Sequence, residues 1–376
     1  MLFRSVRTGI SADSWSARCT AAILAVLIAL SGAASAQAQT RPPPDEAASA
    51  TARPPADGLR RIEALRAEAK AKGWTFQLAY NPAVDRPLTQ LAATVVPADF
   101  ETKAREWDEI SRRLGHIEQD RLSAAGANQS SGAATAMARS PLAPLCNYQP
   151  VMSPIRNQGS CGSCWAFAAM GAWEGTYSLR YGVKYDTSEQ HVLTCAGAGT
   201  CGGGFYAGVF TWMTNNAVRN EAQQAYIAAN GACAIMPTGT YKVANWNYVV
   251  TSPGPAPVNA LKLALVTHGP LVTTIYATGA FQGYGGGVFN ENANPLDANG
   301  NPSINHAVVI VGWDDAKGAW RVRNSWSGSW GEAGYAWVTY GSNNIGAYAA
   351  WVSPVKVGMP WNPVDLGHKV VPTYKN

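Results

Sequence analysis

Two cysteines separated by two residues, Cys161 and Cys164, stand where a glycine-rich loop meets a helical pattern. The loop sequence GSCGSC is typical of a turn. Directly after it, apolar and aromatic side chains recur at spacings of three or four residues, at Ala166, Met170, Trp173, Tyr177 and Tyr181. The pattern predicts a helix that starts at Cys164, and a helix N-terminus lowers the pKa of a thiol. Such a pair can be a redox dithiol, half of a zinc site, or two residues with separate roles.

The first 38 residues have the composition of a cleaved signal peptide. Three arginines precede the apolar run at 21–30, and small-residue cleavage sites follow within 34–38. The run is too short for a membrane span, which needs about 20 residues, so we expect no stable membrane anchor after signal cleavage. A secreted or periplasmic destination is oxidising and favours disulfides. Cys19 leaves with the signal, so six of the seven cysteines remain.

Composition divides the rest of the chain. We expect a Pro- and Ala-rich linker at 39–57, two helical patterns at 58–122, a flexible connector at 123–144, a single domain at 145–358 and a tail at 359–376. Hydrophobic residues make up 47% of the chain and charged residues 14%, which predicts a well-filled core. The net charge of +5 is modest and its basic residues gather in the N-terminal third, so we expect no nucleic-acid partner.

Within 145–358, helical periodicity comes first and strand patterns come later. The predicted strands are 270–277, 306–314, 319–326 and 334–341, and we expect mostly strands and turns beyond residue 245. This segregation favours an α+β fold with separate helical and sheet layers.

Cys164 is a candidate nucleophile, and such a thiol needs a nearby base. Among the five histidines, His306 alone opens a long apolar run, which predicts a ring at the end of a buried strand. Asn324 follows the predicted strand at 319–323, and its amide oxygen could orient one imidazole N–H and leave the other ring nitrogen facing the thiol. The Gln158 amide and the backbone N–H of Cys164 could donate hydrogen bonds to a developing oxyanion.

Four sequence blocks, in the same order, resemble those of the papain family of cysteine proteases. They are NQGSCGSCWAF (157–167), SEQHVLTC to CGGG (188–204), NHAVVIVGW (305–313) and RNSWSGSWGEAGY (323–335). The resemblance implies a two-lobe fold, with a helical left lobe, a β-rich barrel-like right lobe and the active-site cleft between them. It also implies a catalytic role for four residues. Cys164 would be the nucleophile, and His306 would act first as general base and then as general acid. Asn324 would orient the His306 ring, and Gln158 would donate a hydrogen bond to the oxyanion.

The resemblance further implies residues that bind substrate and residues that form disulfides. Gly203 and Gly204 would pair with an extended substrate by strand-like hydrogen bonds. Trp326 would cap the catalytic residues and, with Trp330, line the primed side of the cleft. The implied disulfides are Cys161–Cys201 and Cys195–Cys233, and they leave Cys146 without an assigned role.

We therefore expect an exported, monomeric cysteine endopeptidase that acts on polypeptides and needs no metal or other cofactor. Residues 58–122 would be an inhibitory propeptide, although the usual propeptide motif of the family is not recognisable there.

The main alternative is an exported thiol–disulfide oxidoreductase that uses Cys161 and Cys164. Trp165 argues against it, because redox motifs carry their aromatic residue before the first cysteine. An oxidising compartment disfavours a zinc-stabilised module, since cysteines there tend to form disulfides. The intact set of Cys164 and His306 disfavours a non-catalytic adhesion protein that merely keeps the fold.

Overall fold

A computed structural model describes residues 54–124, 141, 143–233 and 239–357. The expected signal peptide, the tail at 359–376, most of the linker and most of the connector lie outside these residues. No helix in the described ranges is long and apolar enough to cross a bilayer.

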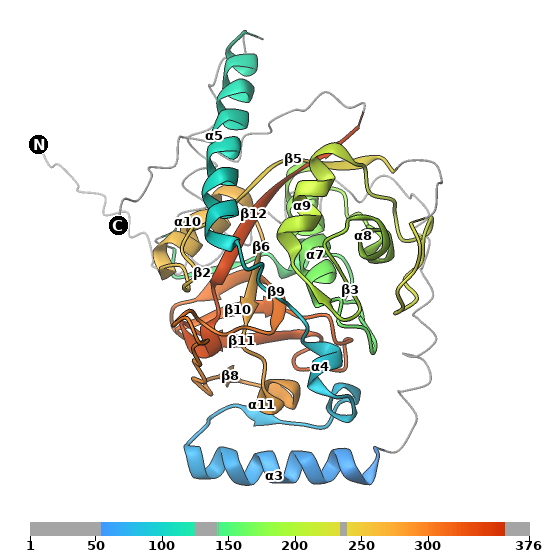
Figure 1. Cartoon of the computed structure of the whole chain (residues 1–376). Coiled ribbons are helices and arrows are strands. Elements are labelled where there is room, and N and C mark those ends of the chain that lie inside the picture. The colour runs from blue at the N-terminus through green and yellow to red at the C-terminus, as the bar shows by residue number, and fades with distance from the viewer. Residues whose placement is uncertain (1–53, 125–140, 142, 234–238, 358–376) are drawn as a thin grey trace, which may run out of the picture.

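The N-terminal segment, residues 54–124, contains both helices that the sequence predicts. Its elements are α3 (Ala56–Lys72), β1 (Gln77–Leu78), η2 (Pro82–Asp85), α4 (Leu88–Leu91) and α5 (Phe100–Ala124). α3 starts inside the expected linker and α5 ends inside the expected connector, so the folded segment is slightly longer than 58–122. α3 and α5 lie at opposite ends of the molecule, and the chain between them crosses its middle (Figure 1).

The helical layer is built around one buried helix. Its elements are η3 (Gln149–Val151), α7 (Cys164–Tyr181), α8 (Glu189–Cys195), α9 (Tyr206–Asn215) and the hairpin of β3 (Gly199–Thr200) with β4 (Gly203–Gly204). α7 begins at Cys164, as predicted, and is capped after Tyr181 by Gly182, whose φ of 68° is a left-handed conformation that suits glycine. Side chains are buried on all faces of α7, which is typical of a central core helix.

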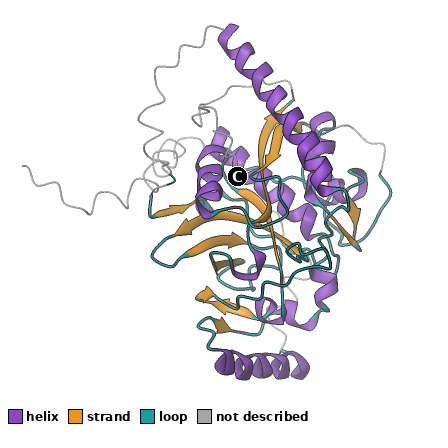
Figure 2. Ribbon diagram, turned by 60° about the vertical axis from the view of Figure 1, so that its left-hand side comes forward, coloured by secondary structure: helices purple, strands orange, loops and turns teal. Residues whose placement is uncertain are grey.

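The second layer is an eight-stranded sheet with the order β5-β12-β6-β9-β10-β11-β8, and β2 pairs with β9. The strands are β2 (Leu145–Asn147), β5 (Tyr241–Tyr248), β6 (Leu271–Ile275), β8 (Val288–Phe289), β9 (His306–Asp314), β10 (Ala319–Arg323), β11 (Tyr335–Thr339) and β12 (Ala347–Lys356). β11 and β8 pair in parallel, and the other described neighbours are antiparallel. Within 145–357 most helices precede residue 245 and most sheet strands follow it, so the predicted α+β class is confirmed; Figure 2 colours the helices and strands separately.

The predicted strands correspond to β6, β9, β10 and β11, and β9 has the predicted bounds. β10 ends at Arg323, before the predicted end at 326. The sequence predicted mostly strands and turns beyond residue 245 and missed the helix α10 (Val258–His268). The remaining elements of this region are short: α11 (Gly279–Gln282), β7 (Tyr284–Gly286) and η4 (Ser342–Asn344). α10 is apolar and largely buried, and periodicity does not separate helix from strand in such a run.

Helix α7 joins the two layers, because it packs against both β9 and β12. Gly175 on α7 permits a close approach: a Cβ at this position would lie 2.5 Å from Met152 Sδ and 2.8 Å from Pro270 Cγ. A second contact region lies between α9 and β5, where Phe210 packs against Trp246 with ring centroids 5.8 Å apart. The core is therefore continuous from the helical layer into the sheet.

Phe210 is fully buried, so Phe210→Ala is expected to lower the free energy of unfolding by about 3–5 kcal/mol through lost burial and a residual cavity. Thr211→Ala, at the exposed neighbouring position, is the control and is expected to change stability by less than about 0.5 kcal/mol. Urea unfolding followed by circular dichroism measures both. Equal unfolding midpoints for the two variants would contradict the described core.

Candidate active site

The loop before α7 is closed by the Cys161–Cys201 disulfide, whose Cα atoms lie 4.5 Å apart, and by a 2.9 Å hydrogen bond from Gly162 N to Cys201 O. The second disulfide joins Cys195 to Cys233. Both implied pairings are therefore confirmed. Because Cys161 is bonded to Cys201, it forms no dithiol with Cys164, and the oxidoreductase alternative loses its reactive pair. In the described residues, no group of three or more His, Cys, Asp or Glu side chains could hold a metal ion.

The sheet places His306 and Asn324 side by side. His306 is the first residue of β9, and Asn324 follows β10, which pairs with β9 through Arg323 and Val309. The His306 Nε2 atom lies 2.8 Å from Asn324 Oδ1, which also accepts the backbone N–H of Ser325. Since Asn324 Oδ1 accepts, Nε2 carries the proton, and Nδ1 is left without an oxygen or nitrogen partner among the described residues.

Trp326 covers this pair. Its ring centroid lies 4.5 Å from that of His306, and Trp326, His306 and Asn324 are all buried. Exclusion of water strengthens the hydrogen bond and holds the imidazole in one orientation. Trp330 packs edge-on against Trp326 and is fully buried, with its Nε1 donating to Phe281 O. Its expected contact with substrate in the primed cleft stays a prediction.

Cys164 is fully buried at the start of α7 and has an unusually acidic thiol. Burial by itself raises the pKa of this thiol. The charge of the neighbouring His306 and hydrogen bonds from His306, Thr94 and the Ala93 backbone outweigh burial, and the pKa falls to about 7. A substantial fraction of the sulfur is therefore thiolate at neutral pH, which is the nucleophilic form.

Gln158 is fully buried, and both ends of its side-chain amide are engaged. Its Nε2 donates to Leu91 O at 3.0 Å and to Cys161 O at 2.9 Å, and its Oε1 accepts from Ser325 Oγ at 2.7 Å. The Ser325 contact fixes the orientation of the amide, with its oxygen toward Ser325 and its nitrogen toward the two carbonyl groups. The amide thus donates to a peptide carbonyl from the N-terminal segment, as an oxyanion donor would.

Residues 91–95, named here the blocking segment, lie directly on these groups. Thr94 Oγ1 is 3.2 Å from Cys164 Sγ. Ala93 O accepts from Gly204 N at 3.1 Å and Val95 N donates to Gly204 O at 3.0 Å, in a parallel strand-like pairing. On the other side, Thr94 N donates to Asn305 O at 2.8 Å. An extended peptide segment therefore already occupies the position between the two layers.

Gly203 has to be glycine for this pairing. Its φ is +133°, and a Cβ there would lie 2.7 Å from Ala93 O. Gly204 is enclosed as well, since a Cβ would lie 2.5 Å from Ala198 O and 2.6 Å from Trp165 Cε2. Gly203 thus lets the backbone at Ala93 approach closely, and Gly204 lets its own strand pack on Ala198 and Trp165; their expected contact with substrate stays a prediction.

A cluster of buried carboxyl groups adjoins the site. The small cavity beside Asn324 and Ser325 is also lined by Arg156, Glu189 and Arg323. Burial, and the charge of nearby Glu174, raise the pKa of Glu189 well above its ordinary value. Burial also raises the pKa of Glu221, to about 7.

Sequence reasoning did not find Thr94 or Ser325 as parts of this arrangement. Ser325 lies inside a quoted block beside Asn324, so its neighbourhood was a usable signal. Thr94 lies 70 residues before Cys164 in a stretch without any pattern that indicates chemistry.

The pH dependence of Cys164 ionisation tests the described electrostatics. In the full chain, where Thr94 covers Cys164, the ultraviolet absorbance of the thiolate should reach half of its maximum near pH 7, because the pKa is about 7. His306→Ala leaves burial but removes the compensating charge and hydrogen bond, so the midpoint should move to higher pH. The difference in absorbance from Cys164→Ser, recorded across the pH range, isolates the signal of this thiolate. Thr94→Ala removes a single hydrogen bond and should shift the midpoint less; an unmoved midpoint in His306→Ala would refute the pairing.

Comparison with known proteins agrees with this geometry. Curated relatives include the gamete and mating-type specific protein A of Dictyostelium discoideum (33% identity; 54% of this chain, 44% of that protein), fruit bromelain of Ananas comosus (35%; 54% and 56%) and cathepsin K of Mus musculus (34%; 51% and 58%). The alignments thus span about half the length of these relatives.

Two solved structures cover more of the chain. The digestive procathepsin L2 proteinase from the larval midgut of Tenebrio molitor has a TM-score of 0.61 at 25% identity, over 82% of this chain and 97% of that one. Procathepsin L 3 of the same source shares the fold, with a TM-score of 0.58 at 23% identity over 79% of this chain and 89% of that one. A model of the family described as papain family cysteine protease matches residues 146–355. Since that match spans more than half of the 376 residues, the chain belongs to the papain family of cysteine proteases.

Proposed function

We propose that the chain is an exported cysteine endopeptidase that is made as a zymogen and hydrolyses peptide bonds through a Cys164–His306 pair. The observation that carries the proposal is the buried cluster of Cys164, His306 and Asn324, in which the thiol pKa is lowered to about 7. Two disulfides suit an oxidising, secreted or periplasmic location. We propose polypeptides as substrates and a monomer as the active form.

The reaction would proceed in two steps through an acyl-enzyme. The Cys164 thiolate attacks the peptide carbonyl carbon, and the Gln158 amide and the Cys164 backbone N–H donate to the resulting oxyanion. The C–N bond then breaks, and the His306 imidazolium gives its proton to the leaving amine. In the second step His306 takes a proton from water, the hydroxide attacks the thioester, and the C–S bond breaks to release the carboxylic acid and the thiolate.

Gly203 and Gly204 would bind the substrate backbone in the same way that Gly204 binds Ala93 and Val95. A polypeptide in extended form supplies the N–H and C=O groups that such pairing needs. Residues 201–230 contain no long insertion that would close one end of the site, which favours an endopeptidase over a dedicated exopeptidase.

The inhibitory role of the N-terminal segment rests on the blocking segment. Thr94 contacts the Cys164 sulfur, and Leu91 O accepts a hydrogen bond from the Gln158 amide. Ala93 and Val95 form hydrogen bonds with the backbone of Gly204. A substrate needs the same groups, so it cannot bind while residues 91–95 remain in place.

Two anchors hold the blocking segment, one at each end. Before it, β1 pairs antiparallel with β7, and Phe76 packs against Phe289 with ring centroids 4.6 Å apart. After it, Trp107 on α5 stacks on Trp246, with centroids 4.9 Å apart, and its Nε1 donates to Trp246 O at 2.7 Å. Anchors on both sides keep the segment in the site with little loss of conformational freedom on binding.

Substitution of the nucleophile tests the reaction. Cys164→Ser is expected to abolish casein cleavage by the processed enzyme, because a buried serine hydroxyl does not ionise in this site. Asn324→Ala should lower kcat about 10- to 100-fold, since it frees the imidazole to rotate. Cys146→Ser is the matched thiol control: Cys146 pairs with Trp313 in the register, near the far end of β9 from His306, and its loss should leave kcat unchanged. Full proteolysis by Cys164→Ser would exclude the proposed nucleophile.

Weakening an anchor tests the zymogen. Trp107→Ala in the full chain should raise the initial rate of cleavage of a small fluorogenic peptide, because it removes a ring stack and a hydrogen bond that hold α5 on β5. Glu109→Ala, at an exposed position of the same helix, is the control and should leave the rate as in the wild type. If the unprocessed wild-type chain already cleaves at the rate of the processed enzyme, residues 58–122 do not inhibit.

A further inference from the structure

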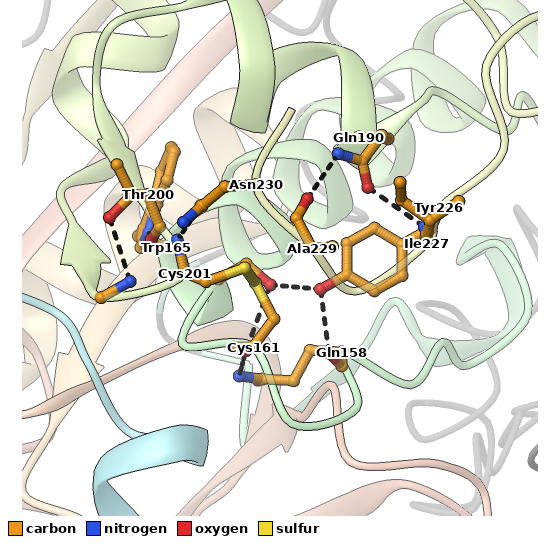
Figure 3. The surroundings of a disulfide bond; sticks show 12 residues. Gln158, Cys161, Trp165, Gln190, Thr200, Cys201, Tyr226, Ile227, Ala229 and Asn230 are labelled. Carbon is orange, nitrogen blue, oxygen red and sulfur yellow. Dashed lines mark hydrogen bonds between the residues drawn. A yellow bond between two sulfur atoms is a disulfide. The ribbon is translucent and has the colours of Figure 1, made fainter. Parts of the chain in front are cut away.

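We propose that Tyr226 is a positioning residue for the oxyanion site, with its hydroxyl holding together the two ends of the loop that carries both oxyanion donors. This inference rests on the proposed function. The Tyr226 hydroxyl donates to Gln158 O at 2.8 Å and lies 2.6 Å from Ser163 Oγ. Figure 3 shows the Tyr226 hydroxyl at the centre of these contacts, close to the Cys161–Cys201 disulfide.

The two ends of this loop carry, or immediately precede, the N–H groups that would meet the oxyanion. Gln158 supplies its side-chain amide, and Ser163 immediately precedes Cys164, which supplies its backbone N–H. Both Gln158 and Ser163 are fully buried. Within the loop, Cys161 O accepts from Gln158 Nε2 at 2.9 Å and faces Ser163 Oγ at 3.4 Å. One phenolic hydroxyl therefore contacts both ends of the loop, each next to a group that would donate to the oxyanion.

The Tyr226 ring is itself held in place, as a positioning residue requires. Its edge packs against Phe167 on α7 with centroids 4.8 Å apart, and its backbone N donates to Glu221 Oε1 at 2.8 Å. Gln190 fixes the following residues, because its Oε1 accepts Ile227 N at 3.1 Å and its Nε2 donates to Ala229 O at 2.9 Å (Figure 3). Removal of the hydroxyl alone therefore leaves the Tyr226 ring and residues 226–229 in position.

The hydroxyl is a hydrogen-bond donor throughout the working range of a protease. Burial raises the pKa of the Tyr226 phenol above its ordinary value and outweighs the hydrogen bond with Ser163, which lowers it; a charge on Cys164 raises it further. The phenol keeps its proton when Cys164 is a thiolate, so its contact with Gln158 O persists in the reactive state of the enzyme.

The test compares Tyr226→Phe with Tyr185→Phe, both made in the full chain and processed in the same way, with active sites counted by alkylation of Cys164. Tyr185 is the matched control, since its hydroxyl contacts Asn220 at 3.4 Å and Tyr241, both outside the 158–164 loop. Loss of a direct oxyanion donor lowers kcat about 10²–10³-fold, so loss of a residue that positions two donors should lower kcat about tenfold. KM should stay within about twofold of wild type, because the hydroxyl does not bind substrate.

Iodoacetamide alkylation of Cys164 provides the second readout. Alkylation needs the thiolate but forms no oxyanion, so its rate and pH midpoint in Tyr226→Phe should equal those of wild type. Ser163→Ala removes the other hydroxyl of the pair and should likewise lower kcat while the alkylation rate stays that of wild type. This variant keeps the test valid if Tyr226→Phe folds poorly. The double variant should lose no more activity than the larger single loss, because both hydroxyls act on one loop.

Each outcome decides the proposal. A kcat for Tyr226→Phe equal to that of Tyr185→Phe overturns it, and so does an equal fall in turnover and alkylation, which would indicate general distortion of the site. Failure of the proposed function looks different: the wild-type chain would then show no proteolysis that depends on Cys164.

Discussion

The packing of helix α7 against β9 is the contact on which the rest of the site depends. α7 carries Cys164 at its first turn, and β9 begins with His306, so the two reactive groups come from different layers. Close approach of these layers requires a small residue on the helix, and a Cβ at Gly171 would already lie 3.3 Å from Val309 Cγ2. β10 then brings Asn324 to His306, because β10 and β9 are antiparallel neighbours. A shift of the helix along the sheet would separate sulfur from imidazole without changing either layer.

Burial has opposite effects on the ionisable groups around this contact. It opposes ionisation of Cys164, yet in the same low-dielectric surroundings the charge of His306 acts strongly on the sulfur and lowers its pKa to about 7. For Glu174 and Glu189, burial is the dominant influence, and it raises the pKa of each carboxyl group. Within the same enclosure, the pKa of the thiol is therefore lowered while the pKa values of the neighbouring carboxyl groups are raised.

The N-terminal segment occupies backbone groups of the site that can bind an extended chain. Gly204 offers one N–H and one C=O group to an extended chain, and residues 91–95 satisfy both. Because the segment continues on each side into an anchored element, β1 on β7 and α5 on β5, its local concentration in the site is high. Under the proposed function, release of the segment and exposure of the nucleophile are one event.

The sequence alone determined the elements whose patterns are local. The start of α7 at Cys164 and the bounds of β9 follow from periodicity and from an uninterrupted apolar run, and family resemblance supplied both disulfides and the candidate residues Gln158, Cys164, His306 and Asn324. The tertiary structure decided what depends on contacts between distant segments. Tyr226 lies 63 residues from Ser163, and Thr94 lies 70 residues from Cys164. Helix and strand repeats relate residues within one element and do not reach across such separations. Only the packing of the completed layers brings these side chains together.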